Sequence, residues 1–226
     1  IYTVNADGTG ARRLTHSPKY DAPGPLSPDG RRMLFYSQRS PKGDVWVMNA
    51  DGSAQRNLTR SAAHDGGGSW SPDGKKILFD TDRDGNAELY VMNADGSGQR
   101  NLMPSPSSQE YASGWSPDGR TILFATDRDG NWELYSADAD GGNPRNLTRN
   151  PAKDGTFGLW SPDGRKIAFA SARDTHDQDN SELYVMNADG TGITRLTHAR
   201  GVEFPLSWSP DGRKLAFSRY PLEPRW

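Results

Sequence analysis

Residues 70–96 read WSPDGKKILFDTDRDGNAELYVMNADG, and this stretch decides the fold. Asp-Gly pairs occur in it three times, between short runs of aliphatic and aromatic residues. This pattern is a strong hairpin signal, because Gly adopts the positive φ of a tight turn without strain. Pro72 lies inside a turn, where its missing N–H removes no hydrogen bond of a sheet. With its flanks, the stretch predicts strands at 67–70, 76–79, 88–92 and 99–102, joined by turns at 71–74, 82–86 and 93–96.

The same pattern occurs five times along the chain. Ser-Pro-Asp-Gly begins at Ser27, Ser71, Ser116, Ser161 and Ser209, in steps of 44, 45, 45 and 48 residues. Asn-Ala-Asp-Gly or a close variant occupies 5–8, 49–52, 93–96, 138–141 and 187–190. Markers in a fixed order at nearly constant spacing indicate a repeat protein. Four antiparallel strands in about 45 residues are typical of one blade of a β-propeller.

The phase of the repeat bears on ring closure. The chain opens with the third and fourth strands of a unit, 1–4 and 12–15, and ends with a first and second, 206–208 and 214–218. Pairing between these half-units would remove two exposed sheet edges. We therefore expect an all-β fold, with residues 1–226 as a single domain. This domain is a five-bladed β-propeller with four antiparallel strands per blade, closed by a blade split between the N- and C-terminal halves. The alternative is a fragment of a longer ring.

Composition excludes several classes of protein. The 226 residues contain no Cys, which excludes a disulfide scaffold, a thiolate nucleophile and a Cys-bound metal. A formal net charge of −2 gives no electrostatic reason to bind nucleic acid. No apolar run approaches the ~18 residues of a membrane helix, so no membrane insertion is expected. No signal peptide is visible at the start of the chain. We expect a monomer.

At these markers the sequence resembles the TolB-like β-propeller repeat family, whose repeats carry Trp-Ser-Pro-Asp-Gly. The resemblance covers nearly the whole chain, and it implies a propeller fold and a periplasmic or secreted location. It does not specify function, because the same repeat serves both binding proteins and propellers of peptidases. The chain departs from known members in two ways. It has room for neither a sixth blade nor an amino-terminal domain, and it lacks the Gly-x-Ser-x-Gly nucleophile motif of a hydrolase.

Aromatic residues repeat at fixed positions, and we interpret them as packing between blades. A ring that every unit carries at one position is first explained by what every unit must do. The alternative for the tryptophans is an aromatic platform for sugars or peptides. The positions are Trp70, Trp115, Trp160 and Trp208 on the first strand, with Leu26 in their place in the first unit; Phe35, Phe79, Phe124, Phe169 and Phe217 on the second; and Tyr90, Tyr135 and Tyr184 on the third.

A carboxylate lies six residues before most of the Ser-Pro-Asp-Gly turns, where one unit connects to the next. In a propeller these connections surround one mouth of the central channel. A partly enclosed ring of carboxylates raises its pKa values or recruits a cation or a basic partner. We name this position the acid slot, and it comprises Asp21, Asp65, Glu110, Asp154 (one place earlier than the others) and Glu203.

The alternative for the acid slot is pairing with arginine. Arg39, Arg83, Arg128 and Arg173 each follow a second-strand Phe by four residues, in a loop that opens on the same face. We expect such ion pairs to brace adjacent blades.

The fourth unit carries a longer loop that the other units lack, and we predict it as a further contact site. An insertion in one repeat is not required by the fold. Its candidate residues are Asp174, His176, Asp177 and Asp179. The related loops 82–88 and 127–133 have oxygen ligands at alternate positions but lack a full calcium-loop spacing. We expect no cofactor other than a cation such as Ca²⁺ in the channel.

These observations favour a non-catalytic binding scaffold that presents its acidic channel mouth to a protein or peptide, with or without a bound cation. One alternative is a metal-assisted lyase acting on uronate polysaccharide, using His64 or His198. Another is a propeller detached from a larger peptidase-type or TolB-type protein. No catalytic motif is found.

Overall fold

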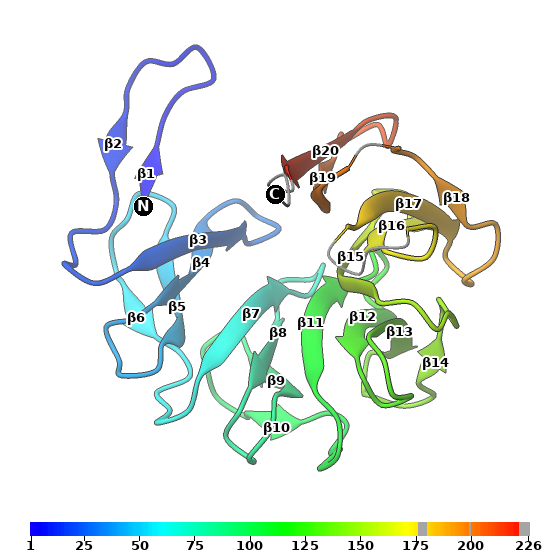
Figure 1. Ribbon diagram of the computed structural model, residues 1–226. Helices are drawn as coiled ribbons and strands as arrows, with labels where there is room; N and C mark the ends of the chain where they lie inside the picture. Colours follow the sequence, from blue (N-terminus) through cyan, green and yellow to red (C-terminus); the bar gives the residue numbers. More distant parts are fainter. Residues whose placement is uncertain (176–179, 199, 222–226) are drawn as a thin grey trace, which may run out of the picture. The chain divides into compact units, whose positions relative to one another are not determined.

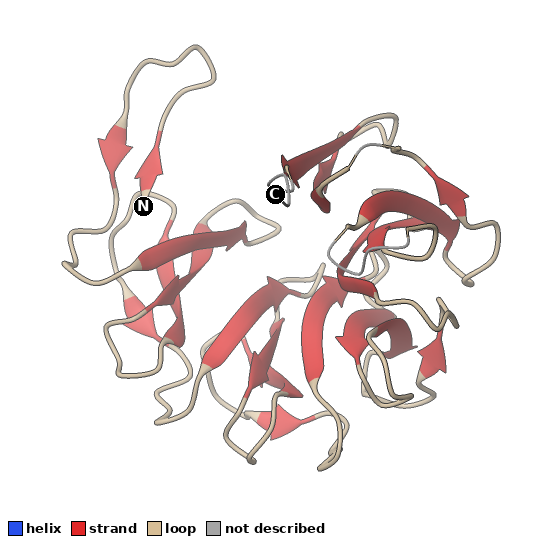
Figure 2. Cartoon of the chain, viewed as in Figure 1, coloured by secondary structure: helices blue, strands red, loops and turns tan. Residues whose placement is uncertain are grey.

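A computed structural model describes residues 1–175, 180–198 and 200–221. The chain divides into two compact units, Ile1–Pro106 and Ser107–Trp226. All regular structure in the described residues is β-strand (Figure 2). Within those residues no helix is long and apolar enough to cross a membrane.

The first unit contains one two-stranded sheet and two four-stranded sheets, all antiparallel (Figure 1). Each four-stranded sheet follows chain order, with its first strand at one edge and its shortest strand at the other. The strands are β1 (Tyr2–Thr3) and β2 (Arg12–Arg13); β3 (Asp21–Leu26), β4 (Arg32–Ser37), β5 (Asp44–Asn49) and β6 (Arg56–Asn57); and β7 (Asp65–Trp70), β8 (Lys76–Thr81), β9 (Glu88–Asn93) and β10 (Arg100–Asn101).

The second unit mirrors this plan, with two four-stranded sheets followed by a two-stranded one. The strands are β11 (Glu110–Trp115), β12 (Thr121–Thr126), β13 (Glu133–Asp138) and β14 (Arg145–Asn146); β15 (Asp154–Trp160), β16 (Lys166–Ser171), β17 (Glu182–Asn187) and β18 (Thr194–Arg195); and β19 (Val202–Trp208) and β20 (Leu215–Tyr220).

The predicted repeat of four antiparallel strands is confirmed in the four complete sheets. The outer strand is shorter than expected: β10 pairs only two residues with β9, against the four predicted at 99–102. Each outer strand carries at least one arginine, and charge on an edge strand discourages pairing with other chains. Closure into a ring of five blades, and the action of both units as one domain, stay predictions.

Packing between consecutive sheets uses the repeated aromatic positions of the complete sheets, as expected, whereas Leu26 and Phe217 are 50% and 40% exposed. Trp70 at the end of β7 is buried in one cluster with Leu34, Val45 and Val47 of the preceding sheet. In the second unit, Trp160 packs against a cluster that joins Leu123 to residues of β16 and β17. Burying an aromatic side chain of this size contributes on the order of 2–3 kcal/mol. Trp70 and Trp160 therefore pack one sheet onto the next.

A second contact between consecutive sheets explains the glycine of the Asn-Ala-Asp-Gly turns. Gly96 has a φ of +86°, and a Cβ placed on it would lie 2.9 Å from the backbone oxygen of Leu58 in the preceding sheet. Gly190 stands in the same relation to Leu147, at 2.8 Å. Only a residue without a side chain permits both the positive φ and this approach of two backbones.

We predict that Gly96→Ala lowers the free energy of unfolding by about 1–3 kcal/mol more than Gly85→Ala does. Gly85 also has a positive φ, +108°, but a Cβ there would meet nothing within 4 Å. The control therefore carries the backbone strain alone, and the difference measures the close approach to Leu58. Urea unfolding of both variants gives the two values, and equal losses would contradict the packing role.

Candidate functional site

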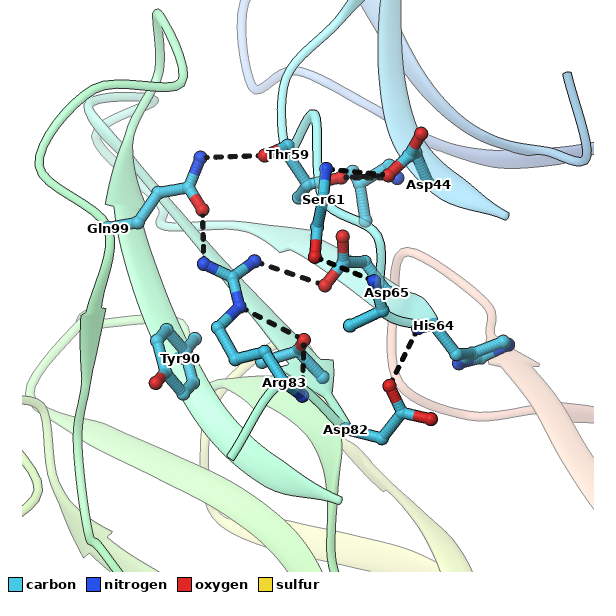
Figure 3. A network of polar contacts seen from close by, with 12 residues as sticks. Asp44, Thr59, Ser61, His64, Asp65, Asp82, Arg83, Tyr90 and Gln99 are labelled. Carbon is cyan, nitrogen blue, oxygen red and sulfur yellow. Dashed lines mark hydrogen bonds and ion pairs between the residues drawn. The ribbon is translucent and has the colours of Figure 1, made fainter. Parts of the chain in front are cut away.

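Asp65 in the acid slot forms an ion pair with Arg83 of the same sheet (Figure 3). The Arg83 guanidinium places Nη2 3.1 Å from Asp65 Oδ1, donates from Nε to Thr81 Oγ1 at 3.1 Å, and donates from Nη1 to Gln99 Oε1 at 2.7 Å. The register brings them together, because Asp65 on β7 lies opposite Thr81 at the end of β8, and Arg83 follows two residues later. The guanidinium also lies 4.7 Å from the centre of the Tyr90 ring.

Gln99 extends this network to the preceding sheet. Its Nε2 donates to the carbonyl oxygens of Leu58 and Thr59, at 3.1 and 3.3 Å (Figure 3). The same chain of contacts recurs in the sheet before, where Arg39 binds both Asp21 and Gln55, and Gln55 donates to the carbonyl of Leu14. A carboxylate, an arginine and a glutamine thus connect one sheet to its predecessor.

Every acid-slot residue has an arginine partner. The expectation of pairs between adjacent blades is wrong in detail, because each pair joins the first strand of a sheet to the residues that follow, or end, the second strand of the same sheet. The fifth repeat departs from the pattern, since Arg219 lies within β20, at the position that holds Ser or Thr in the other repeats. The pairs are Asp21–Arg39 (2.9 Å), Asp65–Arg83 (3.1 Å), Glu110–Arg128, Asp154–Arg173 (2.8 Å) and Glu203–Arg219 (2.5 Å).

These pairs hold the acid slot below the surface. The five carboxylate side chains are only 0–3% exposed, while their arginines are 11–39% exposed. A partner therefore meets the arginine before it meets the carboxylate. Carboxylate oxygens of the slot that are buried without a hydrogen-bond partner among the described atoms include Asp21 Oδ1 and Asp65 Oδ2. Convergence of the five acids on one channel mouth involves both units and stays a prediction.

The net pKa shift has opposite directions for two members of the slot. For Asp154, burial raises the pKa from the ordinary 3.8 to about 6, against the lowering effect of Ser171 and Arg173, and the nearby Glu133 raises it further. For Asp21, burial also raises the pKa, but hydrogen bonds from Ser37 and Arg39 outweigh it, so the net direction is downward. The slot is one structural position with two electrostatic outcomes.

A second row of buried carboxylates was missed by the sequence reasoning, although it repeats just as regularly. Each begins the third strand of its sheet, and each is bound by the fourth strand or by the segment that follows it. Asp44 accepts from Asn57 Nδ2 at 2.6 Å and from Thr59 Oγ1 at 3.0 Å, and Glu182 pairs with Arg195. The row consists of Asp44, Glu88, Glu133 and Glu182.

The loop aspartates have a repeated structural role. Tyr184 donates from its hydroxyl to Asp174 at 2.7 Å, and Tyr90 and Tyr135 donate in the same way to Asp84 and Asp129. Burial, followed by the hydrogen bond to the carboxylate, raises the pKa of Tyr90 and of Tyr135 to about 12. Asp174 therefore belongs to the repeat rather than to the insertion.

The other three candidate residues of that loop, His176, Asp177 and Asp179, lie outside the described residues. In the related loop 82–88, Asp82 accepts from the backbone of His64 and pairs with Lys42, so its oxygens already have partners. Over residues 1–175, 180–198 and 200–221 no group of three or more His, Cys, Asp or Glu is placed to hold a metal ion. The calcium prediction stays untested.

The residues that do differ between repeats flank the acid slot. The position before it holds Tyr20, His64, Gln109, Lys153 and Val202, and the position after it in the strand holds Ala22, Gly66, Tyr111, Gly155 and Phe204. The turns at the opposite end of the sheets are nearly identical in all repeats. Rings gather at the variable end: Tyr36 lies between Tyr20 and His64 in the first unit, and Tyr111 stacks on Trp132 at 5.4 Å in the second.

A hollow of about 640 Å³ in the second unit lies at the opposite end, between the turns after β11, β15 and β17. Asp118, Asp163 and Asp189 line it, with Arg145 and Trp160. The three aspartates belong to the repeated turns, where each accepts hydrogen bonds from its own turn. The hollow is thus built from residues that the repeat itself requires.

We predict that Arg83→Met lowers the free energy of unfolding by about 3–5 kcal/mol, because it leaves the Asp65 carboxylate buried and unpaired. The matched control is Lys75→Ala, which breaks the exposed pair with Asp73 (side chains 79% and 57% exposed) and should cost less than about 1 kcal/mol. Urea unfolding compares the two, and the double variant Asp65→Asn/Arg83→Met should recover part of the loss. Equal effects of Arg83→Met and Lys75→Ala would refute the bracing role.

Asp154 gives a pH-dependent prediction. Its folded pKa lies above 3.8, so the folded state binds the extra proton and loses stability as pH rises from about 4 through 6. The unfolding free energy of the wild type minus that of Asp154→Asn should fall by up to about 3 kcal/mol over this range. Asp21→Asn is the control of opposite sign: its lowered pKa makes the wild-type advantage disappear as pH falls below about 4. Chemical denaturation across pH measures both, and parallel curves would contradict the assignment.

The chain resembles TolB from Acinetobacter baumannii with a TM-score of 0.75 at 24% identity, over 94% of this chain and 52% of that one. A putative TolB from Agrobacterium tumefaciens matches with a TM-score of 0.71 at 22% sequence identity, over 97% of both chains. Oligogalacturonate lyase from Vibrio parahaemolyticus matches with a TM-score of 0.70 at 18% sequence identity, over 97% of this chain and 65% of the lyase chain. The chain thus spans about half the length of the first of these structures.

A search among curated proteins finds no match. The sequence profile of the tricorn protease N-terminal beta propeller domain matches residues 41–157, which is more than half of the chain. This match and the TolB-like fold confirm the resemblance inferred from the repeated turns. The protein belongs to the family of the tricorn protease N-terminal β-propeller domain.

Proposed function

We propose that this protein is a non-catalytic binding module whose acid-slot end contacts a protein or peptide partner. The observation that carries the proposal is the uneven variation between repeats. Residues that differ from repeat to repeat flank the acid slot, while the opposite turns are nearly identical. A repeat scaffold needs its packing residues in every copy, whereas contacts with one asymmetric partner need different residues in each.

The kind of residue at this end also supports a protein or peptide partner. Tyr20, Tyr36, Tyr111 and Trp132 are amphipathic rings that supply contact area at a small cost in side-chain entropy. Tyr and Trp are enriched in interface hot spots for the same reason. The acid slot lies beneath them and positions the strand ends that carry them. A cation at the slot would meet the arginine charges, so the proposed contact rests on the rings and their flanking polar groups.

We also propose that the two half-units close a ring of five blades, which would bring all five variable ends to one mouth. The register of β4 with β5 pairs Leu34 with Val47, and the equivalent positions are Ala216 and Thr3. By the same resemblance we expect a periplasmic or secreted location.

Ring closure predicts a disulfide in the variant Thr3→Cys/Ala216→Cys, because residues opposite each other in a sheet lie within bridging distance. The natural chain has no Cys, so the introduced thiols have no competitor. Mild oxidation at low protein concentration, followed by non-reducing electrophoresis and mass spectrometry, detects an intramolecular bridge. The pair Thr3→Cys/Arg213→Cys, placed off register, is the control. Bridges only between molecules, or equal bridging in both pairs, would contradict closure.

A random-peptide display selection on the immobilised chain tests the binding role. Selected peptides should lose binding to Tyr20→Ala or Trp132→Ala and keep it to Lys75→Ala, whose side chain lies at the opposite end of the sheets. Peptides that respond only to the opposite end, or no selectable binder, would overturn the proposal. A chelator-sensitive release of unsaturated products from polygalacturonate would favour the lyase alternative instead.

A further inference from the structure

An aromatic cluster in the first unit combines tilted rings with side-chain hydrogen-bond donors. Tyr20, Tyr36 and His64 form it, with Lys42 beside them. The ring centres of Tyr20 and Tyr36 are 6.4 Å apart and those of Tyr36 and His64 5.7 Å, with interplanar angles of 59° and 40°. Rings tilted in this way do not cover each other's faces as stacked rings do. Tyr20 is 62% exposed, and the His64 ring is exposed as well.

The backbone acceptors around this cluster are already in use. The carbonyl of Tyr20 accepts from Gln38 N at 2.9 Å, and that of His64 accepts from Asp82 N at 3.1 Å. The carbonyl of Lys42 accepts from the Tyr36 hydroxyl at 3.2 Å, and that of Gly43 from Asp65 N at 3.1 Å. Each of these four carbonyls therefore already accepts one hydrogen bond within the protein.

The carboxylate of Asp82, one of those near the cluster, is occupied in the same way. Asp82 Oδ1 accepts from the His64 backbone N–H at 2.8 Å (Figure 3), and Asp82 Oδ2 lies 3.5 Å from Lys42 Nζ. Three side-chain groups can donate to a ligand here: the Tyr20 hydroxyl, an imidazole N–H of His64, and the Lys42 ammonium, whose side chain is 58% exposed.

We propose that this cluster binds a proline-rich segment in the polyproline II conformation. Such a chain has no internal hydrogen bonds, exposes its carbonyl oxygens, and lacks an N–H at every proline. It therefore presents acceptors and apolar rings to a surface of donors and apolar rings, as in other aromatic-lined peptide sites. This inference rests on the proposed binding function and specifies its ligand.

The test is fluorescence anisotropy of the full chain with fluorescein-labelled decaproline. Binding should saturate and should exceed that of a labelled Gly-Ser decapeptide. Tyr20→Ala and His64→Ala should each weaken it about ten-fold, as loss of a hot-spot ring does. Tyr20→Phe keeps the ring and should weaken it less, and Lys75→Ala should leave it unchanged. Circular dichroism checks that each variant is folded.

Several results would overturn the inference: no saturation with decaproline, equal binding of the Gly-Ser peptide, or wild-type binding by Tyr20→Ala and His64→Ala. Binding of a neutral oligosaccharide that Tyr20→Ala abolishes would assign the cluster to carbohydrate. The display selection separates this failure from that of the proposed function. Proline-poor peptides that need Tyr20 would refute the proline inference and retain the binding module, whereas the absence of any binder would refute both.

Discussion

The structure depends on one repeated electrostatic constraint, a carboxylate buried at or next to the start of the first strand of every sheet except β1–β2. A carboxylate removed from water is costly unless a positive charge and hydrogen bonds compensate it. In each repeat an arginine supplies the charge. In the first unit a glutamine accepts a hydrogen bond from this arginine and donates one to a backbone carbonyl of the preceding sheet. The pair therefore sets where the first strand begins and how one sheet meets the next.

This constraint explains why the most regular positions are poor candidates for recognition. The acid slot recurs in every unit with its side chain at most 3% exposed, which is the pattern of a position that the fold itself requires. Asp174 shows the same principle, because its Tyr184 contact repeats that of Asp84 with Tyr90. Positions without a repeated role, such as Tyr20, His64 and Tyr111, are free to differ, and they lie where the strand ends reach the surface.

The division between a uniform scaffold and a variable end has an energetic basis. The close backbone approach at Gly96, the packing of Trp70 and the buried ion pairs cannot change without a loss of several kcal/mol. Residues that flank the slot differ from repeat to repeat, so the fold does not require one particular side chain there. Solved structures with a similar fold include TolB and an oligogalacturonate lyase, so the fold by itself does not specify a function.

The strands, their order and the turns could be predicted from the sequence, because Asp-Gly and Ser-Pro-Asp-Gly act locally and repeat with one period. The sequence also identified the Arg39 and Arg83 class as partners of the acid slot, although it assigned them to neighbouring blades. Only the tertiary structure decided that each pair lies within one sheet, since the β7–β8 register and not sequence distance sets that contact. The third-strand acids, the Arg219 substitution and the ring cluster around Tyr36 likewise depend on which strands lie side by side. A local pattern carries no record of such long-range proximity.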